Sequence, residues 1–278
     1  MYEAQKSPPP GVEVKKAKIG TAWIGRGLSW LEELMLDSFV ATGHEVVLFS
    51  DVPSNFTPRE GVEFLDMREV FDFTVEQRER MPAASFVDIF RLNMIAKSDY
   101  CWIDSDTIST GELTTWNDYL LVKSFMDEQS GQISNGFLSL PRTSAALNQM
   151  LEEISSGDMD YNWLRPRVRN ALMDMPKEDR FIEAARLRRQ VYGPAYVTSR
   201  LMANNELELL RPKDLLDPVP WDLTDLFFDP KGGAYAWFAD ETVGVHVALS
   251  QIRPRHIHKG PAEGSFLHNI RKNIQEVQ

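Results

Sequence analysis

The sequence has little cysteine, a minority of basic residues and no long apolar run. Cys101 is the single cysteine among 278 residues, so an internal disulfide and a cysteine-rich zinc site are excluded. The 30 lysine and arginine residues are outnumbered by 41 acidic ones, and the net charge of -11 disfavours wide contact with nucleic acid or anionic membrane. No stretch has the length of a transmembrane helix or resembles a signal peptide. These absences predict a soluble, cytoplasmic protein.

Length and apolar content are sufficient for one large hydrophobic core. Hydrophobic residues make up 43% of the chain, which favours a single domain over a small stapled scaffold. Residues 1–16 are polar and contain three consecutive prolines, so we expect a mobile leader. The folded domain is expected from Ala17 to residue 278, with a charged helical insertion at about residues 157–203.

Alternating strand and helix patterns predict an α/β fold with a mostly parallel central sheet flanked by helices. Ser29 has the form of a helix N-cap, and Gly43 is placed to end the same helix. The fifth expected strand is interrupted by Asn135 and Gly136. Strands are expected at residues 18–24, 45–50, 62–66, 100–103, 132–140 and 242–249, with helices at 30–42, 84–95, 143–155 and 195–202.

Two carboxylates follow the buried strand at residues 100–103. Asp104 and Asp106 stand there with only Ser105 between them, and in a parallel sheet this strand end is where ligands bind. Neighbouring acids repel each other unless a cation lies between them, and oxygen ligands suit Mg²⁺ or Mn²⁺, which bridge carboxylates to substrate phosphates. The alternative is a turn in which these side chains bond only to local backbone.

A second pair of charged residues lies on the helix before that strand. Asp88 and Arg91 are three residues apart, so they share a helix face and can both point toward Asp104 and Asp106. The alternative is that Asp88 completes a capping box with Ser85, or forms a simple surface ion pair with Arg91.

Several motifs, in this order along most of the chain, resemble D-x-D sugar-binding-region glycosyltransferases. Such enzymes include bacterial capsule-type transferases and, more remotely, the catalytic domains of large clostridial glucosylating toxins. One departure is that family members often have a Gly-Gly pair before the D-x-D strand, where this chain has Lys97, Ser98 and Asp99. The motifs are A-W-I-G at 22–25, D-I-F-R at 88–91, W-I-D-S-D at 102–106, S-N-G-F-L-S-L-P at 134–141, Y-G-P at 192–194, G-V-H-V at 244–247 and G-S at 264–265.

The resemblance implies a GT-A, Rossmann-like fold and a metal-dependent hexosyltransferase. The donor would be a nucleotide-diphosphate sugar, such as a UDP-sugar, the cofactor Mn²⁺ or Mg²⁺, and the acceptor a glycan or another hydroxyl compound. Transfer would retain the anomeric configuration, and surface polysaccharide biosynthesis is a possible role by resemblance alone. By position, Trp23 beside Ala22 would contact the nucleobase, and Asn135 would line the sugar pocket. The expected catalytic residues are Asp88, Arg91, Asp104 and Asp106. Asp88 and Arg91 would hold ribose or sugar hydroxyls. Asp104 and Asp106, together with Ser105, would lie around the ribose, metal and diphosphate.

Residues near the C-terminus supply further candidates for the phosphate side of the site. His246 lies in the last expected strand and could be a third metal ligand, with Asp106 the first choice for direct ligation. Ser265 could bond the leaving phosphate, or could simply stabilise a turn. The basic cluster that could close over the phosphates, or could be a solvated loop, is Arg255, His256, His258 and Lys259.

Glycosyl transfer passes through an oxocarbenium-like state while a negatively charged diphosphate leaves. A cation bound beside that diphosphate would therefore fit the chemistry. Aromatic rings at Trp163, Trp221 and Trp237 could bind acceptor sugars or could simply pack. Two alternatives stay open. I-D-S-D-T also matches aspartyl phosphatases, whose first acid is a nucleophile, although their later lysine and second acidic pair are not evident. The other is a non-catalytic nucleotide-sugar-binding protein of the same fold.

Overall fold

The computed structural model describes residues 3–25, 27–124, 132–188, 190–252 and 258–277. A seven-stranded sheet forms its centre, in the order β10-β8-β9-β5-β2-β3-β4, and every neighbouring pair is parallel except the two pairs that contain β9. This confirms the predicted mostly parallel α/β sheet. The strands are β2 (Lys18–Trp23), β3 (Val46–Ser50), β4 (Val62–Asp66), β5 (Tyr100–Ile103), β8 (Leu120–Lys123), β9 (Ile133–Ser139) and β10 (Leu210–Arg211).

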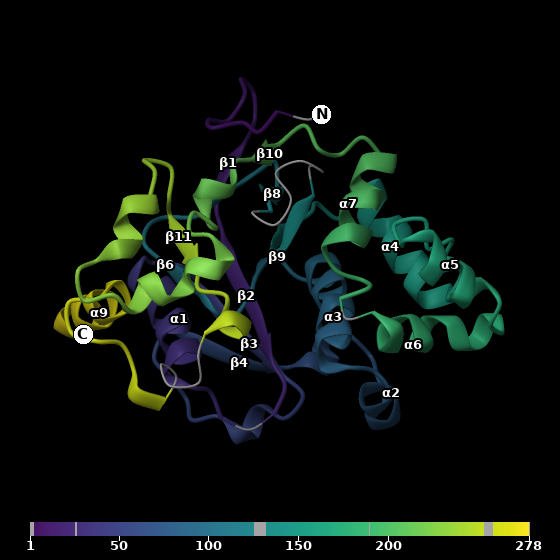
Figure 1. Cartoon of the computed structure of the whole chain (residues 1–278), viewed down its shortest axis with the longest axis horizontal. Helices are drawn as coiled ribbons and strands as arrows, with labels where there is room; N and C mark the ends of the chain where they lie inside the picture. The colour runs from purple at the N-terminus through teal and green to yellow at the C-terminus, as the bar shows by residue number, and fades with distance from the viewer. Residues whose placement is uncertain (1–2, 26, 125–131, 189, 253–257, 278) are drawn as a thin grey trace.

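Helices cover both faces of this sheet (Figure 1). One face is covered by α1 (Trp30–Ala41) and α9 (Phe266–Val277), and the other by α3 (Ala83–Lys97), α4 (Ala145–Ser156) and α7 (Pro194–Ala203). Strand β3 shows why its sequence is apolar throughout. Val47 and Phe49 join the cluster on the α3 side, while Val46 and Leu48 join the cluster on the α1 side.

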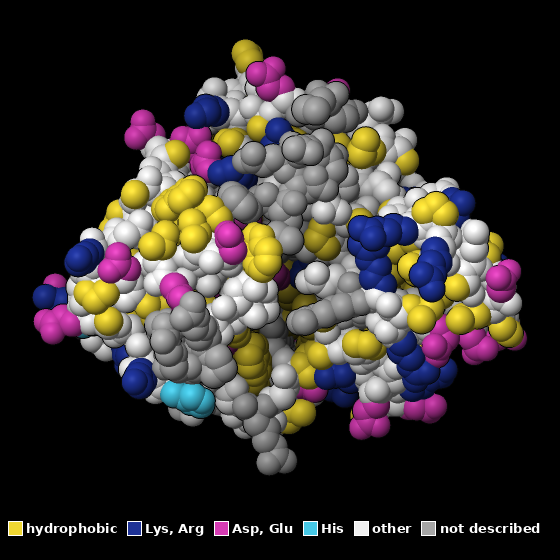
Figure 2. Space-filling model, in the orientation of Figure 1, with side chains coloured by type: hydrophobic (Ala, Val, Ile, Leu, Met, Phe, Trp, Pro, Cys, Tyr) yellow, Lys and Arg dark blue, Asp and Glu magenta, His cyan; other side chains and the backbone are white. Residues whose placement is uncertain are grey.

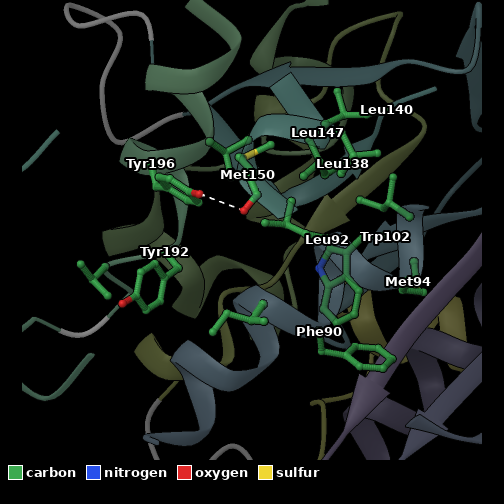
Figure 3. Close-up of a cluster of buried hydrophobic side chains, with 14 of the residues drawn as sticks. Phe90, Leu92, Met94, Trp102, Leu138, Leu140, Leu147, Met150, Tyr192 and Tyr196 are labelled. Atoms are coloured by element: carbon green, nitrogen blue, oxygen red, sulfur yellow. Dashed lines mark hydrogen bonds between the residues drawn. The ribbon is translucent and has the colours of Figure 1, made fainter. Parts of the chain in front are cut away.

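Local sequence signals account for the start of α1, and burial accounts for the apolar character of α3. Ser29 accepts from the backbone at the helix start, and Glu32 bonds back to the Ser29 backbone N–H, as a capping box requires. In α3, buried apolar residues surround most of the helix, and Figure 3 shows Phe90, Leu92 and Met94 in the same cluster as Trp102 of β5. Because α3 is enclosed by protein, its polar residues must find partners inside it.

The predicted charged helical region forms the right side of the molecule in Figure 1. Helices α5 (Pro166–Met173) and α6 (Lys177–Leu187) pack as a hairpin joined by residues 174–176. Helix α7 then returns to the sheet and contacts α4 and β9. A short helix, α2 (Val75–Arg80), lies in the exposed segment before α3.

Two small antiparallel ladders form sheets separate from the central one. Strand β1 (Val14–Lys16) pairs with β7 (Thr114–Trp116), so regular structure begins three residues before the expected Ala17. Strand β6 (Thr107–Ser109) pairs with β11 (Gly244–His246), which is shorter than the strand expected at 242–249. The second ladder matters for the site, because it places His246 opposite Thr107, directly after Asp106.

Other parts of the prediction were wrong in detail. Strand β9 runs without interruption through Asn135 and Gly136, and all its residues are buried between β5 and β8. The C-terminal helix α9 and the short strands β6, β7, β8 and β10 were not predicted. Within the described residues, no helix has the length and apolarity needed to cross a membrane. The described residues also form the 3-10 helices η1 (Pro53–Asn55), η2 (Met67–Glu69), η4 (Lys213–Leu215), η5 (Trp221–Phe228), η6 (Gly233–Trp237) and η7 (Leu249–Gln251).

Candidate functional site

The candidate site lies where parallel strand β5 ends and antiparallel strand β9 begins. Asp104 directly follows β5, and its backbone N–H donates to the Gly136 carbonyl at 2.8 Å. The ladder aligns Ile103 with Phe137, so Asn135 and Gly136 lie at the same sheet edge as Asp104. The carboxyl end of the parallel strands is the edge that α/β proteins use for ligands.

A network of charged and polar side chains connects α3 to this edge. Arg91 donates from Nη1 to Asp88 Oδ1 at 3.2 Å and from Nη2 to Asp104 Oδ1 at 3.1 Å. Asn135 Nδ2 donates to the same Asp88 oxygen at 2.9 Å. Trp102 Nε1 donates to Asp104 Oδ1 at 2.7 Å, and the Arg91 guanidinium lies 4.6 Å from the Trp102 ring centroid. Oδ1 of Asp104 is therefore fixed from two sides by donors.

Burial gives Asp88 unusual acid–base properties. Its side chain is 3% exposed, and burial raises its pKa to about 6, against the opposing effect of the Arg91 charge. Asp88 Oδ2 and Arg91 Nε are both buried, and neither has a hydrogen-bond partner among the described residues. Because buried polar atoms are rarely left unpaired, this acceptor and donor are suited to hydroxyl groups of a ligand.

Gly193 allows the backbone before α7 to approach these groups closely. It is the residue before α7, and a Cβ added there would lie 3.0 Å from Asn135 Nδ2 and 3.2 Å from Asp88 Oδ2. A larger residue would press directly on the network. The Y-G-P motif thus brings α7 close to Asp88, which the sequence pattern did not show.

Asp106 belongs to a different network, contributed by the C-terminal part of the chain. His246 Nε2 lies 3.3 Å from Asp106 Oδ1, and His246 Nδ1 lies 3.8 Å from Asp217 Oδ1. The backbone N–H of Leu249 donates to Asp106 Oδ2 at 2.7 Å across 143 residues of sequence. The Phe137 ring meets the imidazole edge-on at 5.5 Å between centroids. The β6–β11 ladder fixes this arrangement.

Electrostatics favour an ion pair between these two residues when no metal is bound. Burial lowers the pKa of His246, but the facing Asp106 carboxylate outweighs it and holds that pKa well above 6.5. Burial likewise raises the pKa of Asp106, but the His246 charge and the Leu249 N–H outweigh it and hold that pKa below 3.8. A metal ion at His246 must therefore displace a proton.

Asp104, Asp106 and His246 together can hold a divalent cation. One potential ligand atom from each lies within 4.8 Å of the other two. Bonds of about 2.0–2.2 Å place opposite ligands about 4.2 Å apart, so a small inward movement would complete the site. Oδ2 of Asp104 makes no hydrogen bond with any described residue, while its Oδ1 is already occupied. An acceptor with one free oxygen is suited to metal ligation.

The other predicted site residues are distributed unevenly. Trp23 ends β2 at the same sheet edge and is partly exposed, while Ala22 is buried within the strand. Ser105 is partly exposed between the two aspartates. Ser265 is fully buried, and its hydroxyl donates to the Ala262 carbonyl at 2.6 Å and accepts from the His268 N–H at the start of α9. That arrangement matches the turn role rather than the phosphate role.

The C-terminal basic cluster is only partly placed. His258 and Lys259 are exposed, and Arg255 and His256 fall outside the described residues. Of the three tryptophans considered for acceptor binding, Trp163 packs against Tyr196 at 4.6 Å between ring centroids. Trp221 and Trp237 are 41% and 40% exposed and keep a free face.

Sequence reasoning missed several site residues. Asp217 comes from an irregular segment that carries no periodic signal, and Leu249, at the end of the strand expected at 242–249, takes part through its backbone N–H. Trp102 was assigned to the core, although a tryptophan two residues before an aspartate on one strand shares its face, and its N–H needs an acceptor when buried. That spacing was the available signal for its bond to Asp104.

A separate groove lies at the opposite edge of the sheet. Its volume is about 570 Å³, and it is lined by the starts of β2 and β5 and by the end of β9. Neither Asp104 nor Asp106 lines it. Its cationic residues are paired with acids, as Arg142 is with Asp99 at 2.8 Å.

Comparisons with known proteins give a likeness in fold. No protein-family model and no curated protein matches the chain. Among solved structures, the fold is similar to a chain titled "PaToxG Glycosyltransferase", with a TM-score of 0.44 and 15% sequence identity. The alignment covers 69% of this chain and 70% of that chain. The likeness concerns the fold alone.

Proposed function

We propose that this protein is a metal-dependent glycosyltransferase that uses a nucleotide-diphosphate sugar. The observation that carries the proposal is the convergence of Asp104, Asp106 and His246 at a strand end, beside the buried Asp88–Arg91 pair. One group of residues is suited to a cation with a diphosphate, and the adjacent group to hydroxyls. A sugar nucleotide carries both chemical features within a single molecule.

The chain's own residues have distinct tasks in this proposal. Asp104 Oδ2, Asp106 and His246 would hold the ion, which when bound neutralises the charge that develops on the leaving diphosphate. The mixed carboxylate and imidazole set favours Mn²⁺ over Mg²⁺, since Mg²⁺ prefers oxygen ligands. Arg91 and Trp102 fix the other oxygen of Asp104, so the carboxylate needs little reorganisation.

The buried network would orient the donor sugar or ribose. Asp88 Oδ2 can accept from a hydroxyl, and Arg91 Nε can donate to one. Asn135 and Gly193 would border the same pocket, and Trp23 would offer its ring at the neighbouring strand end. UDP-sugar use, retention of configuration and a carbohydrate acceptor follow from the sequence resemblance and form part of the proposal.

Donor turnover tests this function. Hydrolysis or transfer of a panel of nucleotide sugars should depend on added Mn²⁺, and Asp104→Ala and Asp106→Ala should each reduce the rate by roughly 10²–10³-fold. Asp99→Ala is the matched control, because Asp99 is 75% exposed and paired with Arg142 at the opposite edge. Equal turnover by all three variants and the wild type would refute the proposal.

The phosphatase alternative receives less support from the site. Among described residues, the groups that contact the two aspartates come from arginine, tryptophan, histidine and backbone, and none comes from the lysine that such phosphatases need. Phosphate release from simple phosphomonoesters would favour the phosphatase. Donor binding without turnover would favour the non-catalytic binding protein.

A further inference from the structure

The open end of the α5–α6 hairpin carries a group of arginines in an otherwise acidic protein. We call this group the arginine end, and define it as Arg165, Arg167, Arg169, Arg186 and Arg188. The acids Asp174, Glu178 and Asp179 instead lie at the closed end, around the turn that joins the two helices. Figure 2 shows dark-blue side chains over the region where Figure 1 labels α4, α5 and α6.

A tertiary hydrogen bond and a local turn hold the two sides of the arginine end together. Trp163, just before α5, donates from Nε1 to the Val191 carbonyl, just after α6, at 2.8 Å. The Val191 N–H donates in turn to the Arg188 carbonyl at 3.2 Å. The start of α5 and the end of α6 are therefore adjacent, and their cations act on the same volume of solvent.

Three of these cations are free to bind a ligand. Arg165, Arg167 and Arg188 are exposed, and none forms an ion pair with a described residue. The nearby acids are already matched, since Glu183 pairs with Arg186, and Asp160 pairs with Arg200 at 3.0 Å. Arg169 donates only to the neutral Asn162 side chain, at 2.9 Å. The local field is therefore positive despite the net charge of -11.

The arginine end also borders the candidate site. The chain passes from Arg188 to Gly193 within five residues, and a Cβ on Gly193 would meet the Gln190 carbonyl, Asn135 Nδ2 and Asp88 Oδ2 at 3.0–3.2 Å. The segment that follows the arginines thus lies against the buried network. A molecule that reaches this network from the side of the helical hairpin must pass the arginines.

We propose that the arginine end binds an acidic oligosaccharide, whose carboxylate or phosphate groups pair with guanidinium forks while its hydroxyl is presented to the donor site. The proposal rests on the glycosyl-transfer function and specifies the acceptor class. Guanidinium groups match carboxylate and phosphate oxygens bidentately. A membrane surface fits less well, because it needs an apolar face beside the cations. The large exposed apolar side chains on this hairpin, Met173 and Leu187, lie at opposite ends of it.

Binding of oligosaccharides to the full chain tests the proposal. Oligogalacturonate supplies carboxylates, phosphorylated oligomannose supplies phosphates, and a neutral dextran oligomer of equal length supplies neither. We expect one or both acidic probes to bind more tightly than dextran, and added salt to weaken that binding. Arg165→Gln/Arg167→Gln/Arg188→Gln should weaken it by at least about tenfold. The control Lys231→Gln/Arg271→Gln/Lys272→Gln removes three cations elsewhere and should bind as the wild type does.

Separate outcomes distinguish this proposal from the proposed function. Asp106→Ala should lose donor turnover but retain binding of the acidic probe. If no nucleotide sugar is turned over but the arginine-dependent binding is observed, the transferase function is refuted. The arginine end then still stands as a binding site for acidic oligosaccharides. Equal binding of dextran and both acidic probes would overturn the acceptor proposal, as would equal loss in the control triple variant. Binding of phosphatidylserine vesicles through the three arginines, without binding of either acidic oligosaccharide, would also overturn it. Circular dichroism checks that the variants fold.

Discussion

Asp104 and Asp106 are separated by one residue, yet they belong to two different structural systems. Asp104 is bonded to Arg91 and Trp102, all within one helix–strand unit of the central sheet. Asp106 is bonded to His246 and to the Leu249 backbone, which come from the last part of the chain. The first system has an arginine and rigid packing, whereas the second has a titratable imidazole. The comparison indicates that the central sheet fixes one carboxylate, and that contacts from the last part of the chain bring His246 to the other and so complete the candidate metal site.

Removal of Arg91 should produce the largest effect on the Asp104 system. Arg91→Met leaves the Asp88 and Asp104 carboxylates without their shared cation, so we expect a loss of about 3–5 kcal/mol in the free energy of unfolding. Urea denaturation measures it, and Asp88→Asn in the same chain should recover part of the loss. The exposed Arg80→Met serves as control and should change stability by about 0.5 kcal/mol or less. An equal loss in both single variants would contradict the buried network.

The Asp88 carboxyl should make the stability of the folded protein depend on pH. Its folded pKa is about 6 and its ordinary value 3.8, so the unfolded chain releases this proton first as pH rises, and the native state loses stability between these values. Asp88→Asn removes the titration. From pH 4 to pH 7, the free energy of unfolding of the wild type should therefore fall by up to about 3 kcal/mol relative to that of Asp88→Asn. A difference that is constant over this range would show that Asp88 is not held in a desolvated site.

The pH dependence of Mn²⁺ binding tests the contact between His246 and Asp106. Its pKa lies well above 6.5, so metal binding must release a proton, and Mn²⁺ affinity of the wild type should rise with pH while the imidazole remains protonated. His246→Gln should abolish this rise and weaken Mn²⁺ binding at high pH by at least about tenfold. Titrations at pH 6, 7 and 8 measure both effects. The same pH dependence in the variant would place the proton on another group.

Local parts of the site could be predicted from the sequence because their partners are close in the chain. Asp88 and Arg91 lie on one helix face, and the strand that ends at Ile103 necessarily presents Asp104 and Asp106 at the sheet edge. The same is true of the α1 capping box and of the parallel pairs that the alternation of strands and helices implies.

The long-range parts could not be derived in the same way. Asp106 meets Leu249 only because β11 pairs with β6, and strands of three residues carry no reliable periodicity. Asn135 was expected to break its strand, but the ladder with β5 and β8 overrides its local preference. His246 was selected through the family resemblance, whereas its partner Asp217 lies in an irregular segment that no pattern singled out.

Mn²⁺ titration into the wild type, Asp104→Ala, Asp106→Ala and Asp99→Ala at pH 8 tests the central claim most directly. The two carboxylates and His246 form one cluster, so the wild type and Asp99→Ala should bind one ion with the same affinity, while the other two variants should bind at least about tenfold more weakly. Equal affinity in all four proteins would contradict a metal site at the end of β5.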